Sequence, residues 1–261
     1  MDTIIEFRNT NFGYNNTNAF NDFNMQIDEG DIVTLVGPSG SGKTTLLKML
    51  CHKLPNESCY YKGENFPTCN IETLKREVVV VFDAPITESN IKDEVIKYLK
   101  KLNFSKEEIN DRYNEFRTYF SLDEVEDISI QKLSYSVTSL IKILRYLIIK
   151  PKFIAIDNLL SVVSIKRRNQ IINYIKENKI TLLNVSSNLE DSLLGNKLFV
   201  LENFVLILEG STTSVLKADT LLKRLGFRLP LIVDLSIELI HYDLLDNIYT
   251  EEEKLVEKLW K

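Results

Sequence analysis

Nine residues near the start of the chain have the types and spacing that can hold a phosphate group. They are Gly37, Pro38, Ser39, Gly40, Ser41, Gly42, Lys43, Thr44 and Thr45, and they match the pattern G-x-x-x-x-G-K-[ST] in full. Glycines allow the backbone to wrap around a phosphate, and successive N–H groups at a helix N-terminus supply positive potential. Lys43 adds a full charge, and the Thr44 hydroxyl would be a ligand for Mg²⁺. The stretch therefore predicts a nucleotide-binding loop.

The segments around this loop predict the elements that would position it. An apolar run at residues 31–36 precedes it and residues 46–50 follow it, which predicts strand, loop and helix in the order that the motif requires. Residue patterns elsewhere predict helices at 83–136, 137–149 and 166–178, and strands at 3–12, 20–27, 77–82, 152–157, 181–185, 198–201 and 205–208. Residues 212–261 are predicted to be mostly helical. The predicted fold class is therefore α/β with a mixed sheet, and residues 83–136 are predicted to be a helical insertion.

Composition and charge narrow the classes of function. In 261 residues, 44% are hydrophobic and 26% are charged, which is ordinary for a globular protein. A net charge of −5 argues against a dedicated nucleic-acid binder. No apolar run approaches membrane-spanning length, so any membrane role would have to run through a partner. The three cysteines lack metal-ligand spacing and are interpreted as reduced thiols.

The order of these parts resembles the ATP-binding cassette (ABC) ATPases over nearly the whole chain. The predicted insertion ends at residues 133–137, Leu-Ser-Tyr-Ser-Val, where that family carries its L-S-G-G-Q signature, and Pro151 and Asp157 follow at the family's usual distances. The resemblance implies a P-loop NTPase fold of the ABC type that binds ATP and Mg²⁺. The resemblance implies that Thr44 and Asp157 hold the Mg²⁺ ion. It also implies that the ring of Tyr14 stacks on adenine. Ordinary packing at a strand edge is the alternative interpretation of Tyr14.

The C-terminal part narrows the resemblance to one class of transporter. Residues 209–216, 226–233 and 235–239 resemble the C-terminal extension of energy-coupling-factor (ECF) transporter ATPases. The alternative interpretation is a generic importer subunit in which these mostly apolar residues serve ordinary helix packing. The resemblance implies an ABC ATPase domain at 1–210 and an ECF-type extension at 211–261. It also implies a location at the cytoplasmic face of the cell membrane and uptake of a vitamin or metal ion. The implied partners are a second, more intact ATPase subunit in a heterodimer, a transmembrane coupling subunit and a membrane substrate-binding subunit, with no nucleic acid.

Four landmarks of the family are altered in this chain. They are Asn158 for the glutamate that polarises the attacking water, Ser187 for the histidine that faces the γ-phosphate, Asp83 for a glutamine, and Tyr135 with Ser136 for two signature glycines. Ser134 of the signature, which would face the partner's nucleotide, is retained. Loss of a general base typically costs about 10²–10⁴-fold in rate. We therefore predict a subunit that binds ATP and depends on hydrolysis in the partner's site. No residue of this chain is assigned a catalytic role.

Two other functions are compatible with the same residues. In one, the chain is an active ABC transport ATPase in which Asp83 coordinates Mg²⁺ or replaces the missing base. In the other, it is a free-standing ATP sensor without a membrane partner. Hydrolysis by the isolated chain and co-purification with a membrane protein would distinguish the three.

Overall fold

A six-stranded sheet forms the centre of the computed structural model, which describes residues 2–14, 17–126 and 128–260. Its strand order is β10 (Val205–Ser211), β9 (Lys197–Glu202), β3 (Ile32–Val36), β8 (Thr181–Ser186), β7 (Phe153–Asp157) and β6 (Val78–Val81). The strands from β9 to β6 are parallel, and β10 is antiparallel to β9. Every residue of β3 and β8 is buried, as expected for parallel strands that are covered on both faces.

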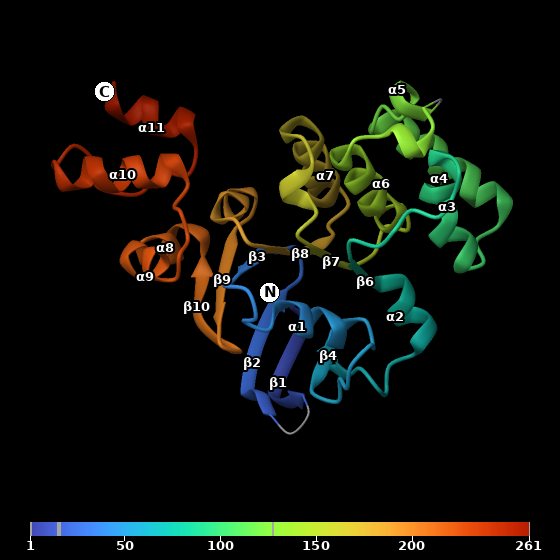
Figure 1. The fold of residues 1–261 in the computed structure, drawn as a ribbon, viewed down its shortest axis with the longest axis horizontal. Helices are drawn as coiled ribbons and strands as arrows, with labels where there is room; N and C mark the ends of the chain where they lie inside the picture. The colour runs from blue at the N-terminus through green and yellow to red at the C-terminus, as the bar shows by residue number, and fades with distance from the viewer. Residues whose placement is uncertain (1, 15–16, 127, 261) are drawn as a thin grey trace.

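A smaller antiparallel sheet covers one side of this core. It consists of β1 (Thr3–Tyr14), β2 (Thr17–Asp28), β4 (Cys59–Tyr61) and β5 (Glu64–Asn65), in the order β2-β1-β4-β5. The apolar residues of α1 (Lys43–Leu50) pack into one cluster with residues of both sheets, and Figure 1 shows α1 beside the small sheet. Residues 12–16 have a turn-rich sequence that predicts a turn between the first two strands, but strand β1 continues through residues 12–14. Residues 15–16 lie outside the described residues.

A group of helices lies at the β6 end of the large sheet, drawn in green in Figure 1. It comprises α3 (Ile91–Lys101), α4 (Lys106–Tyr119), α5 (Asp123–Glu126), η1 (Ile130–Lys132) and α6 (Tyr135–Leu147). The helical prediction is wrong for residues 83–90, which form an irregular loop. There the backbone N–H groups of Thr87 and Glu88 donate to the side chain of Glu94, and Arg145 of α6 pairs with that same buried carboxylate.

The C-terminal helices pack against the opposite end of the sheet (Figure 1). They are α8 (Thr212–Leu216), α9 (Asp219–Arg224), α10 (Leu231–His241) and α11 (Glu252–Leu259), which confirms the mostly helical prediction for this part. Strand β10 ends at Ser211, one residue beyond the predicted domain boundary, and the division into two domains stays a prediction.

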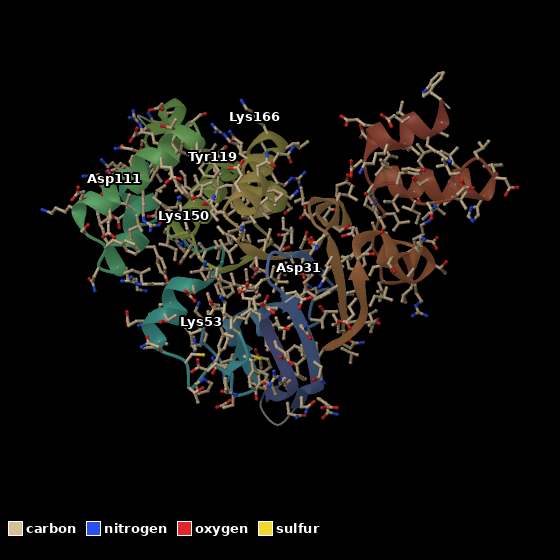
Figure 2. The ribbon with its side chains drawn as sticks, turned by 180° about the vertical axis from the view of Figure 1, so that it is seen from behind. Asp31, Lys53, Asp111, Tyr119, Lys150 and Lys166 are labelled. Carbon is tan, nitrogen blue, oxygen red and sulfur yellow. The ribbon has the colours of Figure 1, made fainter. Side chains whose placement is uncertain are left out.

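The remaining elements complete the frame around the central sheet. They are α2 (Ile71–Glu77), α7 (Ile165–Glu177), η2 (Leu160–Val162) and η3 (Leu189–Leu194). Asp31, labelled in Figure 2, is buried directly before β3. Its carboxylate accepts a hydrogen bond from the Asn196 amide and forms an ion pair with Lys197. This network ties the start of the strand that carries the predicted loop to β9. Among the described helices, none is long and apolar enough to cross a membrane.

Candidate nucleotide-binding site

The predicted phosphate loop joins the end of β3 to the start of α1 and borders a cavity of about 320 Å³. The cavity is lined by Gly37, residues 39–45, Asn158, Ser187 and Phe204. The structure therefore brings the loop together with two of the four altered landmarks. Asp83, the third, does not line this cavity.

Two glycines of the loop stand where no side chain fits. A Cβ atom on Gly37 would lie 2.2 Å from the Leu201 carbonyl oxygen. A Cβ atom on Gly42 would lie 2.6 Å from Cδ1 of Phe204, and Gly42 also has a φ of +109°, which favours glycine. Close packing around the loop thus fixes both positions as glycine.

Lys43 places a positive charge at the centre of the loop. Its Nζ donates to the carbonyl oxygens of Gly37 at 2.6 Å and Pro38 at 2.9 Å. Burial lowers the pKa of Lys43, and the nearby negative charge of Asp157 opposes that shift. An ammonium held between loop carbonyls beside a helix N-terminus is suited to bind a phosphate.

Thr44 and Asp157 offer the oxygen ligands that Mg²⁺ prefers. Thr44 is exposed in the cavity at the start of α1, and Asp157 is half-buried at the end of β7. Burial raises the pKa of Asp157, while a hydrogen bond from Asn158 and the charge of Lys43 lower it. Mg²⁺ is usually held by one or two protein groups together with phosphates and water, so this small donor set fits the ion.

Asn158 joins the end of β7 to the loop after β8. Its Nδ2 donates to Asp157 Oδ1 at 3.2 Å, and its Oδ1 accepts the backbone N–H of Ser187 at 3.1 Å. Its φ of +54° is left-handed, a conformation that asparagine tolerates better than most residues. The amide can orient a water molecule, but it cannot accept a proton from it.

Asp83 is bound to the predicted signature helix α6 instead of the cavity. Lys142 Nζ donates to its Oδ1 at 2.5 Å and the Tyr135 hydroxyl donates to its Oδ2 at 2.8 Å. We name these three side chains the Asp83 clasp. The Lys142 ammonium and then the Tyr135 hydroxyl lower the pKa of Asp83, so its carboxylate is a weak base. Two altered landmarks, Asp83 and Tyr135, are thus in direct contact.

The signature residues beside Tyr135 have defined roles at the start of α6. Ser134 is the N-cap residue, and its hydroxyl accepts the backbone N–H of Val137 at 3.4 Å. The Ser136 hydroxyl accepts the backbone N–H of Ser164, which precedes α7, at 3.1 Å. Their predicted role toward a partner's nucleotide stays a prediction.

Residues 20–161, more than half of the chain, match the sequence pattern of the ABC transporter family. The chain belongs to this family. It is 26% identical to the energy-coupling factor transporter ATP-binding protein EcfA of Enterococcus faecium, covering all of this chain and 98% of that protein. It is 30% identical to the spermidine/putrescine import ATP-binding protein PotA of Haemophilus influenzae, covering 81% of this chain but only 59% of PotA.

Solved structures of ABC proteins share the fold of this chain. CbiO1 of Clostridium perfringens superposes with a TM-score of 0.74 at 19% identity, covering 87% of this chain and 95% of CbiO1. An ATP-binding cassette of an ABC transporter, MJ1267, in its ADP conformation superposes with a TM-score of 0.73 at 20% identity, covering 87% of this chain and 99% of that chain. The predicted resemblance and the predicted α/β fold of the ABC type are therefore confirmed. This ABC protein is the ATP-binding subunit of a transporter.

Two aromatic side chains of this ABC subunit flank the loop. Tyr14 is 43% exposed, and its hydroxyl lies 3.2 Å from Thr45 Oγ1 of the loop. The predicted stacking of adenine on Tyr14 stays a prediction, although the residue is adjacent to the loop. Phe204 was not found from the sequence; the available signal was an aromatic residue in the three-residue connection, 202–204, between the strands predicted at 198–201 and 205–208.

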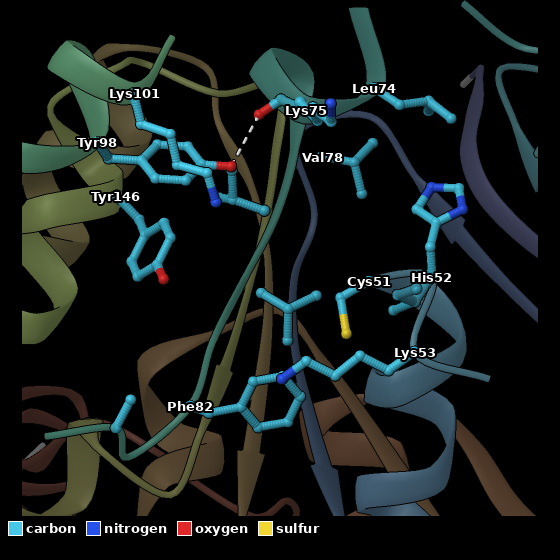
Figure 3. A pocket seen from close by; sticks show the side chains of 14 residues that line it. Cys51, His52, Lys53, Leu74, Lys75, Val78, Phe82, Tyr98, Lys101 and Tyr146 are labelled. Atoms are coloured by element: carbon cyan, nitrogen blue, oxygen red, sulfur yellow. Dashed lines mark hydrogen bonds between the residues drawn. The ribbon is translucent and has the colours of Figure 1, made fainter. Parts of the chain in front are cut away.

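A second cavity of about 270 Å³ lies away from the loop and shares none of its lining residues (Figure 3). It is bordered by the end of α1, by β6, and by α3 and α6 of the helical region. The Lys53 ammonium lies 4.5 Å from the ring centre of Phe82, and the Tyr98 hydroxyl donates to the Lys75 carbonyl at 3.2 Å. This cavity is not part of the candidate nucleotide site.

Proposed function

We propose that this ABC subunit binds Mg-ATP in the loop cavity and hydrolyses it very slowly at its own site. The observation that carries this proposal is Asn158, which stands at the end of β7 with its amide engaged by Asp157 and by the Ser187 backbone. Lys43 and the loop N–H groups bind the phosphates, and Thr44 and Asp157 hold Mg²⁺. The bound ion would neutralise phosphate charge. No group of this chain at Asn158 accepts the proton of the attacking water.

We further propose that the transporter is of the ECF type. The similarity to EcfA extends over 98% of that protein and includes the region of the C-terminal helices, whereas the similarity to PotA covers 59% of PotA. The subunit would pair with a second, more intact ATPase and sit beneath a transmembrane coupling subunit, with a membrane substrate-binding subunit as the third partner. It would be peripheral at the cytoplasmic face, and hydrolysis would occur mainly at the partner's loop.

The Asp83 clasp argues against the alternative in which Asp83 supplies the missing base. Both carboxylate oxygens of Asp83 already accept hydrogen bonds from α6, and its lowered pKa reduces its ability to take a proton. An ABC transport ATPase that uses Asp83 in this way would first have to break the clasp.

Nucleotide binding and turnover by the purified chain test the site. We expect the wild-type chain to bind Mg-ATP with little hydrolysis and K43A to lose binding, because the only loop ammonium is removed. K48A, which removes the next lysine on α1, is the matched control and should bind normally. Unchanged affinity in K43A would contradict the site, and rapid hydrolysis by the isolated wild-type chain would contradict the slow turnover.

Purification of the transport-active complex tests the proposed partners. We expect one copy of this chain with a second ATPase and integral membrane proteins. Replacing the partner's catalytic glutamate by glutamine should stop transport, while N158A should have little effect. A transport-active complex with two copies of this chain and no second ATPase would refute the heterodimer, and a preparation with no membrane protein would favour the free-standing sensor.

A further inference from the structure

Phe204 lies in a backbone conformation that normally belongs to glycine. Strand β9 ends at Glu202 and β10 begins at Val205, so Asn203 and Phe204 alone connect them. Both have left-handed φ angles, +47° for Asn203 and +64° for Phe204. Two-residue hairpins with positive φ at both positions strongly favour Asn-Gly, and a bulky residue at the second position is strained.

The strained residue makes two separate contacts with the phosphate loop. Its backbone N–H donates to the Ser41 carbonyl at 2.9 Å. Its ring lies so close to Gly42 that a Cβ atom there would be 2.6 Å from Cδ1, and it packs edge-to-face on Phe20 with ring centroids 5.2 Å apart. Phe204 also lines the loop cavity. The backbone bond would survive replacement of the side chain, whereas the ring contact would not.

We infer that Phe204 is a positioning residue for the phosphate loop. Its ring fixes Gly42 at a φ of +109°, directly before Lys43 and the first turn of α1. A loop that is already ordered gives up less conformational entropy when phosphate binds, which tightens binding. The strained turn is retained for this purpose, since the hairpin alone would be better served by glycine. The inference rests on the proposed nucleotide site and names a residue that determines its affinity.

The phosphate-loop role makes a specific prediction about ligands. F204G relaxes the turn but also removes the contact of the ring with Phe20, so the two effects on stability oppose each other and the melting temperature without ligand should change little. We expect the Kd to increase about fivefold to tenfold for Mg-ATP, Mg-ADP and inorganic triphosphate alike, because the ring acts on the loop and not on the nucleoside. N203G is the matched control. It relaxes the other left-handed residue of the turn but keeps the ring, and its Kd should stay within about twofold of wild type.

Binding of the three ligands, measured by titration calorimetry, decides between the outcomes. Equal Kd values for F204G and wild type would overturn the inference. A loss confined to ATP and ADP would also overturn it, because the ring would then contact the nucleoside. F204A, which also removes the ring, provides the same comparison if F204G does not fold. Binding of Mg-ATP by the wild-type chain tests the proposed function, whereas the ratio of the variant Kd to the wild-type Kd tests the role of Phe204. Failure of the proposed function and failure of the Phe204 inference are therefore distinguishable.

Discussion

Replacing Asp83 should weaken the contact between the central sheet and the helical region. Asp83 follows β6, and its partners Tyr135 and Lys142 both belong to α6. The Lys142 side chain is only 9% exposed, whereas that of Asp83 is 49% exposed. D83Q introduces the residue that the resemblance to ABC ATPases leads one to expect, and it leaves the buried ammonium without a carboxylate.

The exposed fractions of the Lys142 and Asp83 side chains set the expected loss of stability in D83Q. Breaking a fully buried ion pair costs about 3–5 kcal/mol, and an exposed pair contributes about 0–1 kcal/mol. Because one partner is buried and the other is half-exposed, we expect D83Q to lower the free energy of unfolding by about 1–2 kcal/mol. Y135F removes one exposed hydrogen bond and should cost about 0.5 kcal/mol. E115Q, which breaks the exposed ion pair between Glu115 and Lys150, should change the free energy of unfolding by less than about 0.5 kcal/mol.

Urea unfolding of the four proteins measures this order. The effect of D83Q should exceed that of Y135F, which should exceed that of E115Q; equal effects for D83Q and E115Q would refute the reasoning. The pH dependence gives an independent check. Since the folded pKa of Asp83 is lowered by Lys142 and Tyr135, its contribution is present above the ordinary Asp pKa of about 3.9 and is lost as pH falls through the folded pKa. D83Q and wild type should therefore differ at pH 7 and converge only in strong acid.

Three further changes test other parts of the structure. N158E should restore little hydrolysis even with the partner present, because it replaces a hydrogen-bond donor to Asp157 with a second carboxylate. A large gain in the hydrolysis rate would contradict the proposed role of the other altered landmarks. G42A should weaken ATP binding at least about tenfold, whereas G30A, which has a similar positive φ but open space around it, should leave the affinity unchanged. Burial raises the pKa of the Cys59 thiol to about 12, so this thiol should react with Ellman's reagent at pH 8 only after urea unfolds the chain.

The sequence was sufficient to predict the loop and its flanking elements because their information is local. The G-x-x-x-x-G-K-[ST] pattern fixes a strand, a turn and a helix within about twenty residues, and β3 and α1 follow it. Helix α2 was missed because Leu74 is its one buried residue among those described, so no apolar stripe marks it. The loop at residues 83–90 was not distinguished from the helix that follows, because the carboxylate that accepts its N–H bonds, Glu94, lies outside it.

The contacts within the site were not predictable in the same way. Asp83 and Lys142 are 59 residues apart, and neither periodicity nor spacing relates a loop to a particular turn of a distant helix. Phe204 is separated from Gly42 by most of the chain, and the strain in its turn becomes visible only from its φ angle. Sequence patterns therefore located the candidate residues, whereas the partner of each one is a property of the tertiary structure.

The altered landmarks are joined in pairs by hydrogen bonds, and these bonds determine how substitutions at the four positions combine. Asp83 accepts a hydrogen bond from Tyr135, and Asn158 accepts one from the backbone of Ser187, so the four positions form two bonded pairs. The Asp83–Tyr135 bond joins two side chains, so changing either residue leaves the other without its partner and the two effects are not additive. The Asn158–Ser187 bond uses the backbone N–H of Ser187, which remains when that side chain is replaced. Substitutions at Asp83 and Tyr135 are therefore expected to be coupled, whereas replacing the Ser187 side chain leaves its bond to Asn158 in place.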